Sequence, residues 1–180
     1  MIQRTLMVFL AIGAVGCASA HPSDEVAPGI YELSASADRD ACSPVRAIGA
    51  MGEVAVLVEG GAVDAPVPDT DAPLLVAPRV RLSPSQSYHA ETNRRVPGCE
   101  AAWVHEEWTM LEGGADGFRV LHTQEWQGLA DCAAARDAMP SAPDGDCRAE
   151  RVLDYALESA CHAPCRLVLG EADSVACSCS

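Results

Sequence analysis

Two consecutive runs, residues 101–111 and 118–126, alternate apolar or aromatic side chains with polar ones. Alternation of this kind places successive side chains on opposite faces of a strand. The segment between the runs, Glu112-Gly-Gly-Ala-Asp-Gly117, has the glycine and aspartate content of a chain reversal. We therefore expect an antiparallel hairpin with its turn centred near Ala115.

Several other segments have the composition or the period of strands. They are Gly29–Ala35, Glu53–Glu59, Leu74–Leu82 with Pro78 within it, and Ala149–Glu158. A helix over the last of these stays open, since Glu150, Leu153 and Leu157 also fit a period of 3.6.

The remaining segments predict one helix and two irregular stretches. Residues 129–139 are alanine-rich with apolar side chains at helical spacing, and Pro140 ends them. Residues 65–73 are rich in turn residues, and residues 83–98 are polar without a clear period. The whole pattern favours an all-β fold, a small antiparallel sandwich or barrel with one short helix.

The N-terminus has the features of an export signal. Arg4 precedes an unbroken apolar run from Leu6 to Val15. This run is about ten residues long, whereas a helix that spans a bilayer needs roughly 20. It therefore predicts a cleaved signal peptide and an exported chain.

The end of this run, Ala14-Val-Gly-Cys17, resembles the lipobox of bacterial lipoproteins. The resemblance implies removal of residues 1–16, diacylglycerol on Cys17, a tether over 17–28 and a single domain over 29–180. Because Ala18 follows Cys17, it also implies the outer membrane. The alternative is cleavage after Ala18-Ser-Ala20, which would release a secreted or periplasmic protein beginning at His21.

Export determines how the cysteines are interpreted. Eight lie outside the signal: Cys42, Cys99, Cys132, Cys147, Cys161, Cys165, Cys177 and Cys179. An even number in an oxidising compartment predicts four disulfides. Cys132 and Cys147 bracket a short loop, so we expect them to pair. If residues 165–169 and 175–179 form a hairpin, Cys165 faces Cys177 or Cys179.

The charge excludes some partners. The chain carries 12 arginines, no lysine and 26 acidic residues, for a net charge of −14. Such a chain repels nucleic-acid phosphates and anionic lipid surfaces, so it predicts no nucleic-acid partner. Contact with a membrane should then come only through the lipid on Cys17. A protein or small-molecule partner is not indicated.

The common catalytic and metal motifs are missing. In His105-Glu-Glu-Trp-Thr109, a threonine stands where a zinc protease needs its second histidine. The sequence has no G-x-S-x-G elbow, no calcium loop and no C-x₂-C pair. We therefore predict no catalytic residue, no metal site and no cofactor.

The predicted hairpin does contain one unusual group of residues. With the turn at Ala115, Trp108 lies opposite His122 and Glu106 lies opposite Gln124, which places three polar side chains on the apolar face. Buried polar groups need partners or a wet cavity. Glu106, His122 and Gln124 could therefore line a ligand cavity inside a barrel. They could also lie at a barrel rim, or a register slipped by one residue could exchange the two faces.

These observations predict an exported envelope lipoprotein with a binding or structural role. One alternative is a small secreted hydrolase, in which Glu106 and His122 would lie within hydrogen-bond reach in an open cleft. The other is a lipocalin-like carrier of an apolar ligand, an analogy of architecture alone.

Overall fold

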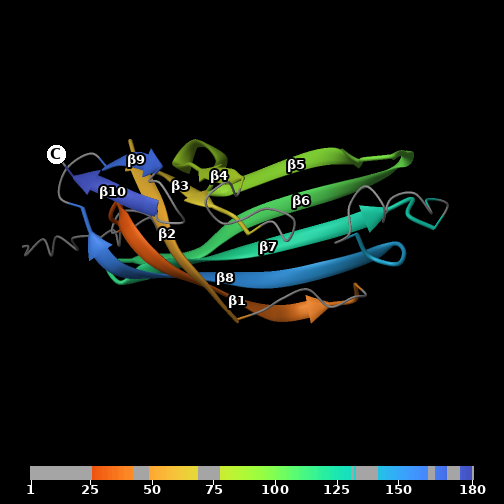
Figure 1. Ribbon diagram of the computed structural model, residues 1–180, viewed down its shortest axis with the longest axis horizontal. Coiled ribbons are helices and arrows are strands. Elements are labelled where there is room, and N and C mark those ends of the chain that lie inside the picture. The colour runs from red at the N-terminus through yellow and green to blue at the C-terminus, as the bar shows by residue number, and fades with distance from the viewer. Residues whose placement is uncertain are drawn as a thin grey trace, which may run out of the picture.

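A computed structural model describes residues 26–42, 49–68, 78–130, 132, 142–161, 165–169 and 175–179. The described chain is almost entirely β-structure (Figure 1). Its elements are β1 (Gly29–Asp40), β2 (Gly49–Glu59), β3 (Ala62–Pro66), β4 (Arg79–Leu82), a 3₁₀ helix (Pro84–Gln86), β5 (His89–Val96), β6 (Cys99–Gly114), β7 (Gly117–Gln127), β8 (Cys147–Ala160), β9 (Cys165–Leu169) and β10 (Val175–Cys179).

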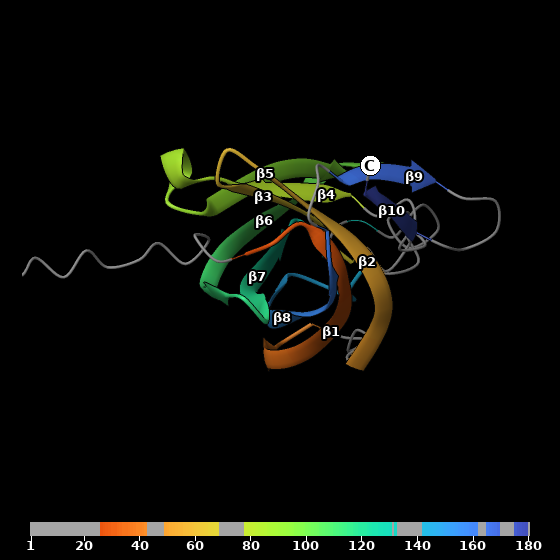
Figure 2. The ribbon, with the colours of Figure 1, turned by 90° about the vertical axis from the view of Figure 1, so that its left-hand side faces the viewer.

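Eight of these strands form one antiparallel sheet that curls into a nearly closed barrel. Their order is β4-β3-β2-β1-β8-β7-β6-β5, so β4 and β5 are the two edges. The sheet wraps around until these edges lie next to each other (Figure 2). No ladder of backbone hydrogen bonds joins β4 to β5, which leaves a seam in the wall. The strands β9 and β10 form a separate hairpin.

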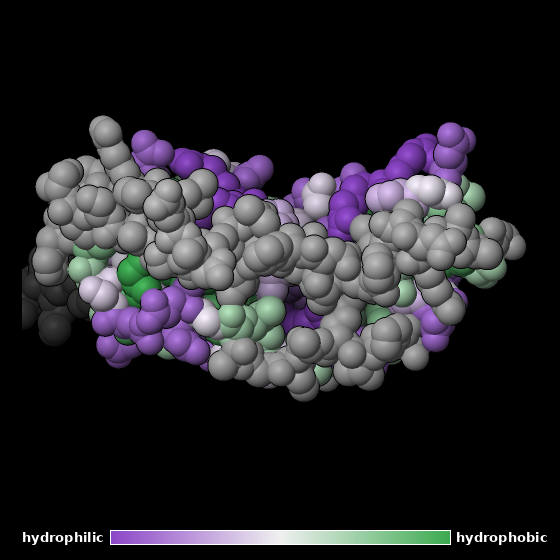
Figure 3. All heavy atoms as spheres, viewed as in Figure 1, coloured by the Kyte–Doolittle hydropathy of each residue, from purple (hydrophilic) through white to green (hydrophobic). Residues whose placement is uncertain are grey.

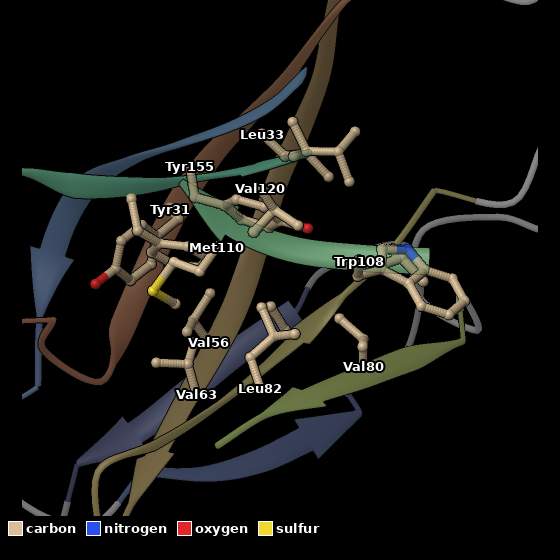
Figure 4. Packing of buried hydrophobic residues seen from close by; sticks show 14 of the residues in the cluster. Tyr31, Leu33, Val56, Val63, Val80, Leu82, Trp108, Met110, Val120 and Tyr155 are labelled. Carbon is tan, nitrogen blue, oxygen red and sulfur yellow. The ribbon is translucent and has the colours of Figure 1, made fainter. Parts of the chain in front are cut away.

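The barrel interior contains two apolar clusters. The larger, here called the main core, includes Tyr31, Leu33, Trp108 and Tyr155 and is seen from close by in Figure 4. Rings pack tightly within it, since Phe118 stacks on Tyr155 with centroids 4.4 Å apart. Val26, before β1, is buried in the same cluster.

The smaller cluster, here called the second core, lies further along the same strands. Its members are Cys42, Val96, Cys99, Ala102, Val104, Trp126, Leu129, Ala142 and Ala149, with Cys132 and Cys147 packed against them. Two disulfides lie in this cluster. Cys42 pairs with Cys147 and Cys99 pairs with Cys132, with Cα atoms 5.2 and 5.9 Å apart. Cys161 is disulfide-bonded as well.

The expected Cys132–Cys147 pair is wrong. The two residues are close in sequence, but Cys147 begins β8, which runs beside β1 and reaches the residues that precede Cys42. Cys132 instead follows β7 and meets Cys99 at the start of β6. Strand pairing therefore determined the partners, and chain proximity did not.

The hairpin and the all-β fold are confirmed, and β8 confirms a strand over Ala149–Glu158 in place of the helix. The prediction that residues 83–98 are irregular is wrong, because β5 occupies half of this segment and the 3₁₀ helix another three residues. The prediction of a turn-rich loop over residues 65–73 is wrong for its first two residues, because β3 continues to Pro66. The predicted helix over 129–139 falls almost wholly outside the described residues, and Leu129, Ala130 and Cys132 are not helical.

The C-terminal hairpin is also confirmed, and its register places Cys165 opposite Cys179. The predicted signal and Cys17 lie outside the described residues. In the part of the chain that the structure describes, no helix has both the length and the apolar character needed to cross a membrane.

The disulfides should hold one end of the barrel together. Closing a loop with a sequence separation of 33 residues is worth about 3–4 kcal/mol on the chain-entropy model. The double variant Cys99→Ala/Cys132→Ala should therefore lose about that much free energy of unfolding in urea titrations. Peptide mapping of unreduced protein checks the pairing, and a peptide that links Cys132 to Cys147 would contradict it.

Candidate functional site: a cavity behind the open seam

A cavity of about 480 Å³ lies behind the seam between β4 and β5. Its apolar wall is formed by Val67, Pro68, Pro78, Val80, Ala90 and Trp108. Its polar groups come from β4, β5, β6 and β7, and they are Arg79, Arg81, Glu91, Thr92, Arg94, Glu106, His122 and Gln124. Both unpaired edges of the sheet therefore contribute to one cavity.

The outer surface beside the seam is polar. In Figure 3, hydrophilic residues follow the upper edge of the molecule, where Figure 1 places β5 and the 3₁₀ helix. Four residues of β5 are exposed: Glu91, Thr92, Asn93 and Arg95. A solvated edge strand of this kind is a common protection against unwanted pairing between sheets.

The register of β6 and β7 brings the three predicted polar residues to this cavity. Trp108 lies opposite His122, and Glu106 lies opposite Gln124, as the hairpin pattern predicts. Glu106, His122 and Gln124 are 8%, 3% and 5% exposed. The slipped register is therefore wrong. A rim position is wrong too, because along β6 the neighbours of Glu106 on the same face, Val104 and Trp108, belong to the second core and the main core.

Glu106 is held by three side chains. Gln124 donates from Nε2 to Oε1 at 2.6 Å, and Arg94 on β5 donates from Nε to Oε2 at 3.1 Å. His122 Nε2 lies 3.4 Å from Oε1 without hydrogen-bond geometry, so this contact is electrostatic when the imidazole is protonated. Burial alone would raise the pKa of Glu106, but His122, Gln124 and Arg94 stabilise the carboxylate and bring its pKa down to about 2.

Trp108 and His122 form a flat stacked pair on the cavity wall. Their ring centroids are 5.1 Å apart and their planes differ by 8°. Both side chains are more than nine-tenths buried. Among the described residues, neither Trp108 Nε1 nor His122 Nε2 has a hydrogen-bond partner. Buried polar atoms without partners are uncommon and lose the hydrogen bonds that water would make, so these two require an explanation.

The polar residues continue beyond the cavity across the barrel. Arg151 on β8 lies opposite His122, and its Nη2 is 3.6 Å from Asp40 Oδ2 at the end of β1. Burial lowers the pKa of Arg151, while Asp40 opposes this change. We call Asp40, Arg94, Glu106, His122, Gln124 and Arg151 the polar layer. It separates the main core from the second core.

Sequence reasoning missed half of this layer. Arg151 could have been found, because it shares the period-two face of Leu153 and Tyr155 in β8. Arg94 could not have been found from the sequence pattern, because its segment shows no alternation of apolar and polar residues. Asp40 lies beyond the predicted end of the first strand.

Near the seam, Arg79 is already fully engaged. Its Nε donates to Asp64 Oδ1 at 2.5 Å, and its Nη nitrogens donate to the carbonyl oxygens of Ala55 and Asp64. Arg81 is different, because its side chain is 54% exposed and its nearest acid, Glu59, lies at 3.7 Å. Arg79 therefore fastens β4 to β2 and β3, whereas Arg81 remains available at the mouth of the cavity.

One group on the outer face of the sheet has metal-ligand chemistry. Glu91, His105 and Glu107 place their ligand atoms within 4.8 Å of one another. Both nitrogens of His105 are already used, since Nδ1 lies 2.8 Å from Asn93 Oδ1 and Nε2 lies 2.9 Å from Glu107 Oε1. The hydrogen bond from His105 also lowers the pKa of Glu107. These hydrogen bonds account for the arrangement.

Fold and cavity define a disulfide-bonded, nearly closed antiparallel β-barrel with a charged layer inside it. Comparison of the chain with protein-family models, with curated proteins and with solved structures finds no match.

The lowered pKa of Glu106 predicts a pH dependence of stability. The pKa of Glu106 is about 2 in the folded protein, whereas its ordinary value is 4.5. The contribution of the ionised Glu106 to the free energy of unfolding is therefore complete above about pH 5, and it is lost as the pH falls towards 2. Its size is on the order of 3 kcal/mol. Glu106→Gln should therefore be less stable than wild type at pH 7, and the difference should shrink by about that amount at pH 2, measured by urea unfolding.

The matched control is Glu112→Gln. This carboxylate also contacts an arginine, Arg119, but its side chain is 63% exposed. Exposed ion pairs add little, so the control should follow wild type across the pH range. Parallel stability profiles for wild type and Glu106→Gln would refute the role given to Glu106.

Proposed function

We propose that this protein is an exported envelope lipoprotein that binds a small organic ligand inside its barrel. The lipobox-like segment at Cys17 and the paired cysteines support export, since disulfides persist mainly in oxidising compartments. The anchor would hold the barrel at the outer membrane, and the acidic surface would keep the domain away from anionic headgroups.

The observation that carries the binding role is the cavity itself. Ligand sites in proteins typically measure about 300–1,000 Å³ and combine apolar walls with a few convergent polar groups. The cavity behind the seam has this size, and Glu106, His122, Gln124 and Arg94 converge on it. The absence of a ladder between β4 and β5 supplies an entrance that does not require the sheet to break.

A hydrolase is the second candidate, and one contact favours it. The 3.4 Å separation of Glu106 and His122 resembles a carboxylate that orients a general base. With a pKa near 2, however, Glu106 remains ionised and would position His122 without itself transferring protons. Thr92 supplies the hydroxyl among the side chains described as lining the cavity. A binding role requires fewer additional groups than catalysis does.

A carrier of a wholly apolar ligand fits less well than a carrier of an amphipathic one. A wholly apolar ligand in the cavity would shield Glu106 and His122 from water and would offer them no hydrogen bonds. Buried polar groups that lose water without gaining partners weaken binding. We therefore favour a ligand with both an apolar part and a polar part.

Filling the cavity tests the binding role. Ala90 lies on β5 and lines the cavity, so Ala90→Phe should occupy part of the space. We expect at least a tenfold loss of affinity for the fluorescent probe N-phenyl-1-naphthylamine, with the melting temperature nearly unchanged. The control Ala156→Phe adds the same bulk at an exposed position of β8 and should bind like wild type. Equal binding of the probe by both variants would refute the cavity as a ligand site.

The location is tested separately by intact mass. Mature protein from membrane fractions should carry diacylglycerol on Cys17, and Cys17→Ala should remove both the lipid and the membrane association. A mature form that begins at His21 and occurs only in the soluble fraction would favour simple secretion instead.

A further inference from the structure

We propose that the cavity selects an organic anion, a carboxylate or sulfonate carried on an apolar body. This inference rests on the proposed binding function and adds the chemical class of the ligand. It is carried by the balance between hydrogen-bond donors and acceptors in the cavity, by the arginines at its mouth and by the flat apolar wall beside them.

The main acceptor in the cavity is already occupied. Glu106 Oε1 accepts from Gln124 and faces His122, and Oε2 accepts from Arg94. A carboxylate with these partners has little to offer a ligand that donates hydrogen bonds. Its compensated charge also makes the cavity a poor site for a cation, because any cation would have to compete with Arg94.

The donors, in contrast, are in excess. Trp108 Nε1 is buried without a hydrogen-bond partner among the described residues, and His122 Nε2 faces only Glu106 Oε1, at 3.4 Å. Arg94 uses Nε on Glu106, and its two Nη nitrogens make no hydrogen bond to the described residues. A ligand that brings acceptor oxygens would satisfy these donors, and hydrogen bonds to a charged acceptor are the strong ones.

The mouth of the cavity adds positive charge to a chain that is strongly acidic overall. Arg81 from β4 and Arg94 from β5 come from opposite sides of the seam, and both line the cavity. Arg81 has only a distant, exposed partner in Glu59. Glu91, also at the rim, is exposed and therefore screened by water and salt. Arginine at both edges suits a planar oxyanion, which it can bind through two hydrogen bonds.

The apolar walls of the cavity indicate the chemistry of the ligand beyond its acidic group. Val67, Val80 and Ala90 offer aliphatic surface, and Trp108 offers a broad ring held against His122. Figure 4 shows the Trp108 ring beside Val80 of β4. An apolar, preferably aromatic, body would bury this surface while its acidic group remains among the donors.

The test uses two probes that differ mainly in charge. 8-Anilinonaphthalene-1-sulfonate is an anion, and N-phenyl-1-naphthylamine has the same ring system without the sulfonate. Fluorescence titration of the folded full chain at neutral pH should give at least tenfold tighter binding of the sulfonate. Equal affinities would overturn anion selection and leave the binding function intact, whereas failure of both probes would overturn the binding function itself.

Three variants test which residues make the cavity prefer the sulfonate to the neutral probe. Trp108→Phe keeps an aromatic ring but removes the N–H donor, and it should weaken binding of the sulfonate severalfold more than binding of the neutral probe. Arg81→Gln should do the same at the mouth. Glu106→Gln should strengthen binding of the sulfonate, because Arg94 then loses its counter-charge. If Glu106→Gln weakens binding of the sulfonate while its circular dichroism stays native, the cavity does not select anions.

The control is Arg95→Gln. Arg95 follows Arg94 in β5, is exposed and donates to the carbonyl oxygen of Glu100 outside the cavity. Its loss changes the net charge as much as Arg81→Gln does, so it should leave both affinities within twofold of wild type. An equal loss of sulfonate binding in Arg95→Gln and Arg81→Gln would show that only the overall charge matters and would overturn the proposal.

Discussion

The ionised carboxylate of Glu106 lies inside a β-barrel, where a charge without partners would be strongly unfavourable. Its partners come from two different strands, since Gln124 belongs to β7 and Arg94 to the edge strand β5. The ion pair therefore connects an edge of the sheet to the interior. Removing either partner would leave a buried group uncompensated.

Different interactions stabilise the barrel on the two sides of the polar layer. On one side, the main core packs large rings such as Tyr31, Phe118 and Tyr155. On the other side, the second core is small, and two disulfides reinforce it. Between the two lies the region where β4 and β5 approach each other without a ladder. A cavity can persist there because the ends of the barrel do not depend on closing that seam.

Local pattern was a reliable guide wherever one face of a strand is buried and the other is wet. The β6–β7 hairpin is such a case, and its register could be deduced because a shift by one residue would have exchanged Val104 and Trp126 for polar neighbours. The β5 strand is the opposite case. Its side chains are mostly exposed or half-buried, so hydrogen bonding to β6 determines its conformation, and its own sequence shows no period.

The chain by itself determined that the fold is built from antiparallel strands, and it determined that Glu106, His122 and Gln124 share the buried face of one hairpin. Both follow from the two-residue period of a strand, which is a local property. Only the tertiary structure decided that Cys147 meets Cys42, that Arg94 reaches Glu106 and that β4 and β5 enclose a cavity. These contacts join residues far apart in sequence, and they depend on how the whole sheet curls, which no short pattern records.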